Sequence, residues 1–146
     1  MNREEALRRL GATRVGRLAT ADRAGVPHVV PFVFVLDRET LYWAVDQKPK
    51  RSQSLKRLEN IRANPNVEVV VDNYSDNWND LWWIRVSGTA RVLGDGEEKR
   101  KALTLLRNKY AQYDSSPPAG PVVAIDAVRI KAWEASSYLS ANAVRA

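Results

Sequence analysis

Short runs of β-branched and aromatic residues, joined by brief turns, constrain the fold of this 146-residue chain more than any other feature. The first two runs are "TRVGRLATAD" and "VPHVVPFVFVLD", which flank "RAG" at residues 23–25. A short turn that ends in glycine is typical of a β-hairpin, so we expect the two runs to pair antiparallel. Strands and helices do not alternate regularly along the rest of the chain, which argues against a parallel sheet.

Six strands and three helices are expected in total, arranged as one domain over residues 1–146. The expected strands are residues 13–22, 26–37, 40–46, 67–74, 81–94 and 122–135, and the expected helices are 3–10, about 49–63 and 95–113. Pro31 cannot donate to a strand ladder, so its strand should lie at an edge, bulge or bend. Together these patterns predict a mainly β (α+β) fold, a small antiparallel barrel with helices packed outside.

Composition excludes several classes of function. The chain has no cysteine, which rules out disulfides, thiolate metal sites and cysteine nucleophiles. His28 is the only histidine, so neither a His-rich metal site nor a histidine-based triad can be argued. No apolar run reaches about 18 residues, so we expect a soluble, cytoplasmic protein. The net charge of +6 favours an anionic partner.

The segment "QKPKRSQSLKRLENI", residues 47–61, has charges that are unusual for the start of a helix. Helix N-termini prefer acidic side chains, but here Lys48, Lys50 and Arg51 come first, before Lys56 and Arg57 one turn later. Backbone N–H groups together with lysine, arginine and Ser52 would bind a phosphate, which offsets the repulsion. The alternative is a solvated basic face whose small energetic cost the fold tolerates.

Exposed aromatic residues are expected in the segment "NYSDNWNDLWW", residues 73–83. Trp78 lies in the middle of a polar loop, where a core position is less natural than contact with a ligand or partner. Trp82 and Trp83 should lie on opposite faces of the following strand, one in the core and one at a subunit interface.

Several motifs in the middle of the chain resemble a known family. These are "AGVPHVVPFVF", "LYWAVD", "KPKRSQSLKRLENIRANPNVEVVVD" and "WWIRVSGTARV". In this order they are similar to the pyridoxamine 5′-phosphate oxidase-like split-barrel flavin-binding (FMN-binding) family. The patterns D-x-K-P-K-R and L-W-W-x-R-x-x-G-x-A most resemble its actinobacterial branch of F420-dependent oxidoreductases, and the chain departs slightly in reading "DNWND".

The resemblance implies a six-stranded split barrel that forms a homodimer, with coenzyme F420 bound in clefts between the subunits. The deazaflavin ring would lie against two strands, and the cofactor phosphate would lie at the start of the basic helix. Lys56 and Arg57 would suit the polyanionic tail of F420, and Trp78 would cover the ring in the partner's cleft. The cofactor-binding residues implied in this way are Val29, Val30, Pro31, Phe32, Ala44, Val45, Asp46, Lys48, Lys50, Arg51, Ser52, Lys56, Arg57 and Trp78.

The implied activity is hydride transfer between reduced F420 and a small organic acceptor, with the protein orienting the cofactor and excluding water. Catalytic side chains are not identified. The proton donor for the acceptor would be Tyr74 or a bound water, or the reaction would need no donor. FMN presents a similar ring and phosphate, so an FMN oxidase or reductase is the alternative. Nucleic-acid binding lacks a motif, and haem binding has only His28 for a ligand.

Overall fold

The computed structural model of the chain describes residues 1–45 and 53–135. Its helices are α1 (Arg3–Ala12), α2 (Gln53–Ala63), α3 (Glu97–Lys109) and α4 (Gln112–Ser115), with a short 3₁₀ turn at Trp78–Asp80. Its strands are β1 (Gly16–Ala21), β2 (Pro27–Phe32), β3 (Val35–Asp37), β4 (Thr40–Ala44), β5 (Asn66–Asn73), β6 (Trp82–Val92) and β7 (Val122–Glu134).

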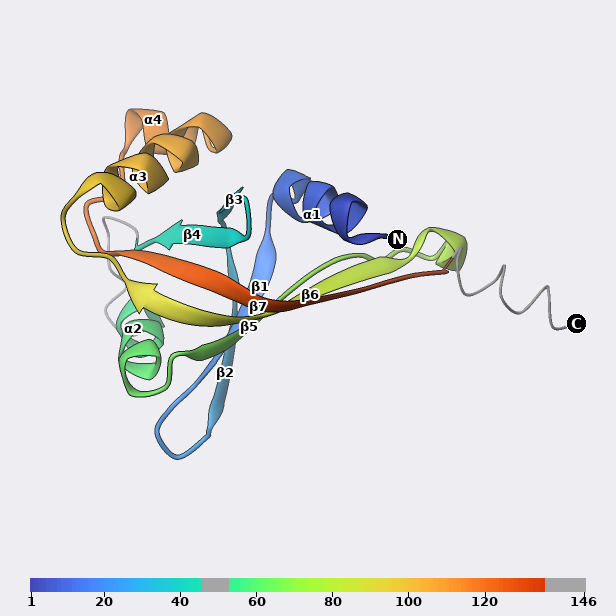
Figure 1. Cartoon of the computed structure of the whole chain (residues 1–146), viewed down its shortest axis with the longest axis horizontal. Helices are drawn as coiled ribbons and strands as arrows, with labels where there is room; N and C mark the ends of the chain where they lie inside the picture. The colour runs from blue at the N-terminus through green and yellow to red at the C-terminus, as the bar shows by residue number, and fades with distance from the viewer. Residues whose placement is uncertain (46–52, 136–146) are drawn as a thin grey trace, which may run out of the picture.

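The strands form one antiparallel sheet in the order β2-β1-β5-β6-β7-β4-β3, which curls into a split barrel (Figure 1). Antiparallel pairing and flanking helices confirm the predicted architecture, but the number of strands is seven rather than six. The expected strand 26–37 is interrupted at Val33 and Phe34, and its two parts become β2 and β3 at opposite edges of the sheet. The edge position of β2 agrees with the expectation drawn from Pro31.

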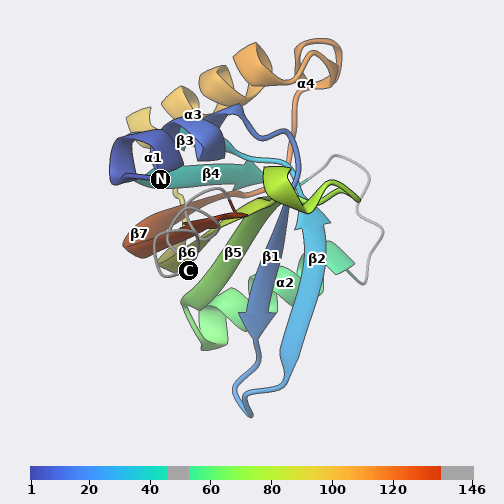
Figure 2. The same cartoon turned by 90° about the vertical axis from the view of Figure 1, so that its right-hand side faces the viewer.

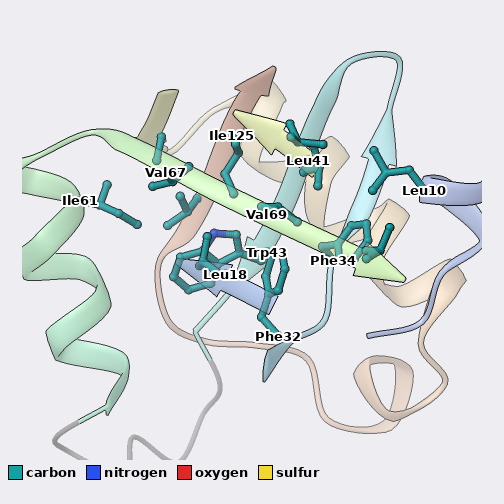
Figure 3. Packing of buried hydrophobic residues seen from close by; sticks show 14 of the residues in the cluster. Leu10, Leu18, Phe32, Phe34, Leu41, Trp43, Ile61, Val67, Val69 and Ile125 are labelled. Atoms are coloured by element: carbon teal, nitrogen blue, oxygen red, sulfur yellow. The ribbon is translucent and has the colours of Figure 1, made fainter. Parts of the chain in front are cut away.

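The main core fills the inside of the curled sheet. Alternate residues of β5, among them Val67, Val69 and Val71, point inward and are at most 4% exposed. Helices close the space from two sides: α1 contributes Leu10 and α2 contributes Ile61 (Figure 3). The sheet can therefore bury its concave face without closing on itself.

A second, smaller core lies between α3 and the outside of the sheet. Ala102, Leu106 and Tyr110 pack there against Tyr42 and Val122, together with other residues of β3, β4 and β7. Strands β4 and β7 are thus covered on both faces at this end, which explains their continuous apolar runs. Figure 2 shows α1 and α3 on one side over β3 and β4, with α2 beside β1 on the other.

Two predicted helix ends are corrected by the structure. Gly11 does not stop the first helix, which runs to Ala12 and is capped at Thr13, whose hydroxyl donates to the carbonyl oxygen of Arg9. The helix expected over 95–113 is divided, because α3 ends at Lys109 and Tyr110 leaves helical geometry. The hydroxyl of Tyr110 accepts a hydrogen bond from the backbone N–H of Phe34 at 3.2 Å. In the two described ranges, no helix combines the length and apolar character needed to cross a membrane.

A charged network fastens α3 to the sheet. Arg91 on β6 donates to Glu98 on α3 at 2.6 Å and to Asp126 on β7 at 2.7 Å. The hydroxyl of Tyr42 donates to Glu98 at 2.8 Å. Hydrogen bonds from Arg91 lower the pKa of Glu98 to about 2, and they also lower the pKa of Asp126.

We predict that this network makes stability depend on pH in acid. Glu98 has an unfolded pKa of about 4.5 and a folded pKa of about 2, so the unfolded chain binds more protons between these values. The stabilisation by Glu98 should be complete above pH about 4.5 and lost as the pH falls toward about 2. Urea unfolding should show the difference between wild type and Glu98→Gln shrinking over this window. Glu97→Gln, at an exposed neighbouring position, serves as the control, and an equal effect there would contradict the prediction.

Candidate functional site

The two ends of the sheet meet at a pocket rather than at a strand pair. Strand β2 ends one side of the sheet, while β4 lies next to the other edge. A pocket of about 230 Å³ lies between them, closed by side chains from α2 and α4. Its lining residues are Pro31, Phe32, Val33, Trp43, Ala44, Arg57 and Tyr113.

Arg57 is the charged group of this pocket. Its guanidinium carbon lies 4.9 Å from the ring centroid of Trp43, so the cation stacks on the indole. The side chain is partly buried, and this burial lowers the pKa of Arg57. No carboxylate forms a salt bridge with it among the residues that the structure describes. Burying a cation without a partner is costly, so the pocket favours an anionic ligand.

Two buried donors in the same pocket lack acceptors. Neither Nε of Arg57 nor Nε1 of Trp43 has a hydrogen-bond partner in the described ranges. Trp43 is 1% exposed, so its N–H lies away from bulk solvent. Buried polar atoms are normally hydrogen-bonded, so these two donors mark a place where polar partners are missing. Figure 3 shows Trp43 and Phe32 extending from the sheet into the barrel interior.

The pocket brings together part of the residue set predicted from sequence. Pro31, Phe32, Ala44 and Arg57 all line it. The other described members do not. Val29 is 62% exposed on the outer face of β2, and Val30 is half-buried on the opposite face. Val45 packs against Gly120, and Lys56 is exposed on α2. The position along β2 decides which residues line the pocket, because Pro31 and Phe32 at the end of the strand both line it although they lie on opposite faces. Asp46, Lys48, Lys50, Arg51 and Ser52 lie outside the described residues.

Three lining residues were missed by the sequence analysis. Trp43 was not among the predicted site residues, and it and Tyr42 are both buried, on opposite faces of β4. Val33 lies in the interruption between β2 and β3, which the sequence did not indicate. Tyr113 was expected inside a long helix, and no local signal places it near Arg57.

Trp78 lies on a loop that side-chain hydrogen bonds hold in shape. The side-chain amide of Asn77 donates to the carboxylate of Asp80 at 2.9 Å. The side-chain amide of Asn73 donates to the backbone carbonyl oxygen of Asp80 at 2.9 Å. Trp78 is nevertheless 74% exposed, and it does not line the pocket of its own chain. The strand after the loop places Trp82 under Arg9 of α1 and Trp83 on the opposite face beside Arg85, so the predicted alternation is confirmed.

Other polar sites are less suited to a ligand. A depression of about 400 Å³ lies beside the loop that holds Trp78, but its charged side chains are already engaged, since Arg9 pairs with Glu5 and Glu134 and Asp80 accepts from Asn77. His28 faces inward on β2, and its Nδ1 has no partner among the described residues. Within the same ranges, no group of three acidic or histidine side chains could hold a metal ion.

Comparison with known proteins identifies the architecture. The family model described as "Pyridoxamine 5'-phosphate oxidase" matches residues 3–134. A FAD-binding protein of Mesorhizobium loti is 26% identical, with a TM-score of 0.69, over 90% of this chain and 94% of that one. No curated protein matches the sequence.

Two more distant structures share the fold. The FAD-binding protein of Mycobacterium smegmatis is 19% identical, with a TM-score of 0.64, over 91% of this chain and 94% of that one. The haem-storage protein HutZ of Vibrio cholerae is 14% identical, with a TM-score of 0.69, over 90% and 82% of the two chains. Proteins of this shape therefore bind different ligands, so the shape alone does not select a ligand for this chain.

We predict that the charge of Arg57, which pairs with no carboxylate in the described ranges, can be detected without any cofactor. Arg57→Met removes a costly buried charge and a favourable contact with Trp43, so the free energy of unfolding should stay within about 1 kcal/mol of wild type. Millimolar inorganic phosphate should raise the melting temperature of wild type more than that of the variant, because it binds the folded pocket. Arg62→Met, at an exposed position on the same helix, should respond like wild type. Equal responses of all three proteins would show that Arg57 binds no anion.

Proposed function

The chain belongs to the pyridoxamine 5′-phosphate oxidase family, and we propose that it is an oxidoreductase dependent on a flavin-type cofactor. In this proposal it transfers hydride between the cofactor and a small organic acceptor. The observation that carries the proposal is the pocket at the split of the barrel, which the partly buried cation Arg57 lines, and in which one donor atom each of Arg57 and Trp43 lacks a partner among the described residues.

The donor set fits such a cofactor. Flavins and deazaflavins carry phosphate, carbonyl oxygens and ring nitrogens, all of which accept hydrogen bonds. The lining offers the donors of Arg57 and Trp43 and the apolar surfaces of Phe32 and Val33. At about 230 Å³ the pocket is smaller than a typical cofactor site, so it would hold only one part of the ligand.

Coenzyme F420 is the cofactor that the resemblance in sequence favours, and FMN is the alternative. The net charge of +6 and the exposed Lys56 next to Arg57 suit the negatively charged tail of F420. The FAD-binding proteins with the same fold support a true flavin instead. Lys50 and Arg51 stay phosphate-binding predictions that rest on sequence alone.

The residues of the pocket would bind and orient the cofactor, and they would take no part in acid–base chemistry. When bound, the cofactor would supply the hydride chemistry. Arg57 would neutralise negative charge, Trp43 would donate to an acceptor atom, and Phe32 with Val33 would exclude water. None of the described lining residues is a carboxylate, histidine or cysteine, which is consistent with a reaction that needs little proton transfer from the protein.

We further propose that two copies of the chain assemble into a dimer. The outer face of β1, β5, β6 and β7 places Arg17, Val70, Arg85 and Lys131 in one row across the strands. Like charges opposite each other, as at Arg85 and Lys131, destabilise an isolated sheet. Exposed Val29, and Arg85 stacked on Trp83, give this face the mixture of apolar, aromatic and arginine side chains that is typical of an interface.

Binding titrations of F420, FMN and FAD to the purified protein test the cofactor proposal. We expect F420 to bind most tightly, and Arg57→Met to weaken its affinity about 10- to 100-fold, the range for hydrogen bonds to a charged group. Tighter binding of FMN than of F420 would make the chain an FMN enzyme. Failure of all three to bind would refute the proposal.

Trp78→Ala tests whether the dimer completes the cofactor site. Because Trp78 is exposed on a loop, we expect the variant to keep the melting temperature of wild type while binding the cofactor about tenfold more weakly. Wild type and variant should both have a mass of about 33 kDa in solution, twice 16.5 kDa. A monomer that binds cofactor tightly would contradict the shared site, and a large fall in melting temperature would make Trp78 structural.

A further inference from the structure

The two walls of the pocket at the split of the barrel are joined behind it by the end of α3. One wall is the segment Pro31–Val33, and the other includes Tyr113 on α4. Phe34 follows the first wall directly in sequence. Tyr110 lies three residues before the second wall and accepts a backbone hydrogen bond from Tyr113 at 3.0 Å.

Side chains from α3 hold the backbone at Phe34. This residue lies in the interruption between β2 and β3, outside any strand. Its N–H donates to the hydroxyl oxygen of Tyr110 at 3.2 Å. Its carbonyl oxygen accepts from Nζ of Lys109 at 2.8 Å and lies 2.9 Å from the same hydroxyl. Lys109, the last residue of α3, and Tyr110, which follows it, therefore both bond to the residue next to the first wall.

Ring contacts also join Phe34 and Tyr110 to residues that line the pocket. Phe34 stacks on Phe32 with ring centroids 5.1 Å apart, and Phe32 lines the pocket. Tyr110 meets Tyr113 edge to face with centroids 6.0 Å apart. Nζ of Lys109 lies 4.4 Å from the ring centroid of Phe34. Tyr110 thus contacts residues next to or in both walls, and Lys109 contacts Phe34 beside the first wall.

Lys109 also connects the junction to the segment between α1 and β1. Its ammonium group also donates to the carbonyl oxygen of Thr13 at 2.7 Å, between α1 and β1. Burial, and to a smaller extent the charge of Arg14, lowers the pKa of Lys109 to about 8. Arg14 itself stacks on Tyr110 and donates to the backbone carbonyl of Lys109 at 2.8 Å. Lys109 therefore connects the end of α3 with the segment between α1 and β1 and with the interruption between β2 and β3.

We propose that Lys109 and Tyr110 are positioning residues of the pocket, which set the separation of its walls and so its affinity for the anionic part of the cofactor. This inference rests on the proposed function for the identity of the ligand. Neither side chain lines the pocket, so each would act only through Phe34 and Tyr113.

Tyr110→Phe and Lys109→Met test the proposal, with Lys109→Arg as the conservative variant. Protein labelled with 5-fluorotryptophan gives a ¹⁹F resonance for Trp43, which Trp43→Phe assigns, and this resonance reports on the pocket without any ligand. We expect Tyr110→Phe and Lys109→Met to shift it and to weaken binding of FMN and of inorganic phosphate about fivefold, the effect of one hydrogen bond. Lys109→Arg, which keeps the charge, should restore at least part of both.

Ile84→Val is the matched control, because it destabilises the core at a fully buried position that does not line the pocket. It should change neither the Trp43 resonance nor the affinities. Equal effects in the control, or an unmoved resonance in both test variants, would overturn the proposal. If wild type binds none of F420, FMN and FAD, the proposed function is wrong, and the Trp43 resonance alone decides whether Lys109 and Tyr110 position the pocket.

Discussion

The curled sheet leaves its two edges unpaired with each other, and the rest of the structure compensates for this gap. The concave face must still be buried, so α1 and α2 pack against it from two sides. Phe34 lies in the interruption between β2 and β3, and its backbone N–H and carbonyl oxygen bond to Tyr110 and Lys109 instead of to a strand. What is left of the gap is the pocket that holds Arg57.

Arg57 illustrates a balance between stability and binding. A cation with its face on Trp43 gains some attraction from the ring, but its hydration is lost and no carboxylate in the described part of the chain replaces it. A fold selected for stability alone would place an apolar side chain there. Retaining the charge is consistent with a ligand that restores the missing interactions, and the same reasoning applies to the indole N–H of Trp43.

Sequence reasoning succeeded where local periodicity decides the structure and failed where distant segments meet. Alternation in "VEVVVDNY" correctly predicted β5 (Asn66–Asn73), and the glycine turn correctly predicted the first hairpin. The break between β2 and β3 was not predicted, because Val33 and Phe34 are good strand residues whose geometry is set by Tyr110, 76 residues away from Phe34. Trp43 and Tyr113 were missed for the same reason, since long-range packing alone brings them to Arg57.

The hydrogen bonds within residues 73–81 have a consequence for how Trp78 would meet a partner. A flexible loop loses conformational entropy when it docks, and this loss weakens the complex. Here Asn73, Asn77 and Asp80 already fix the loop, so that entropy is lost during folding. The backbone that carries Trp78 is therefore ordered before any encounter, which favours docking without a slow rearrangement of the loop.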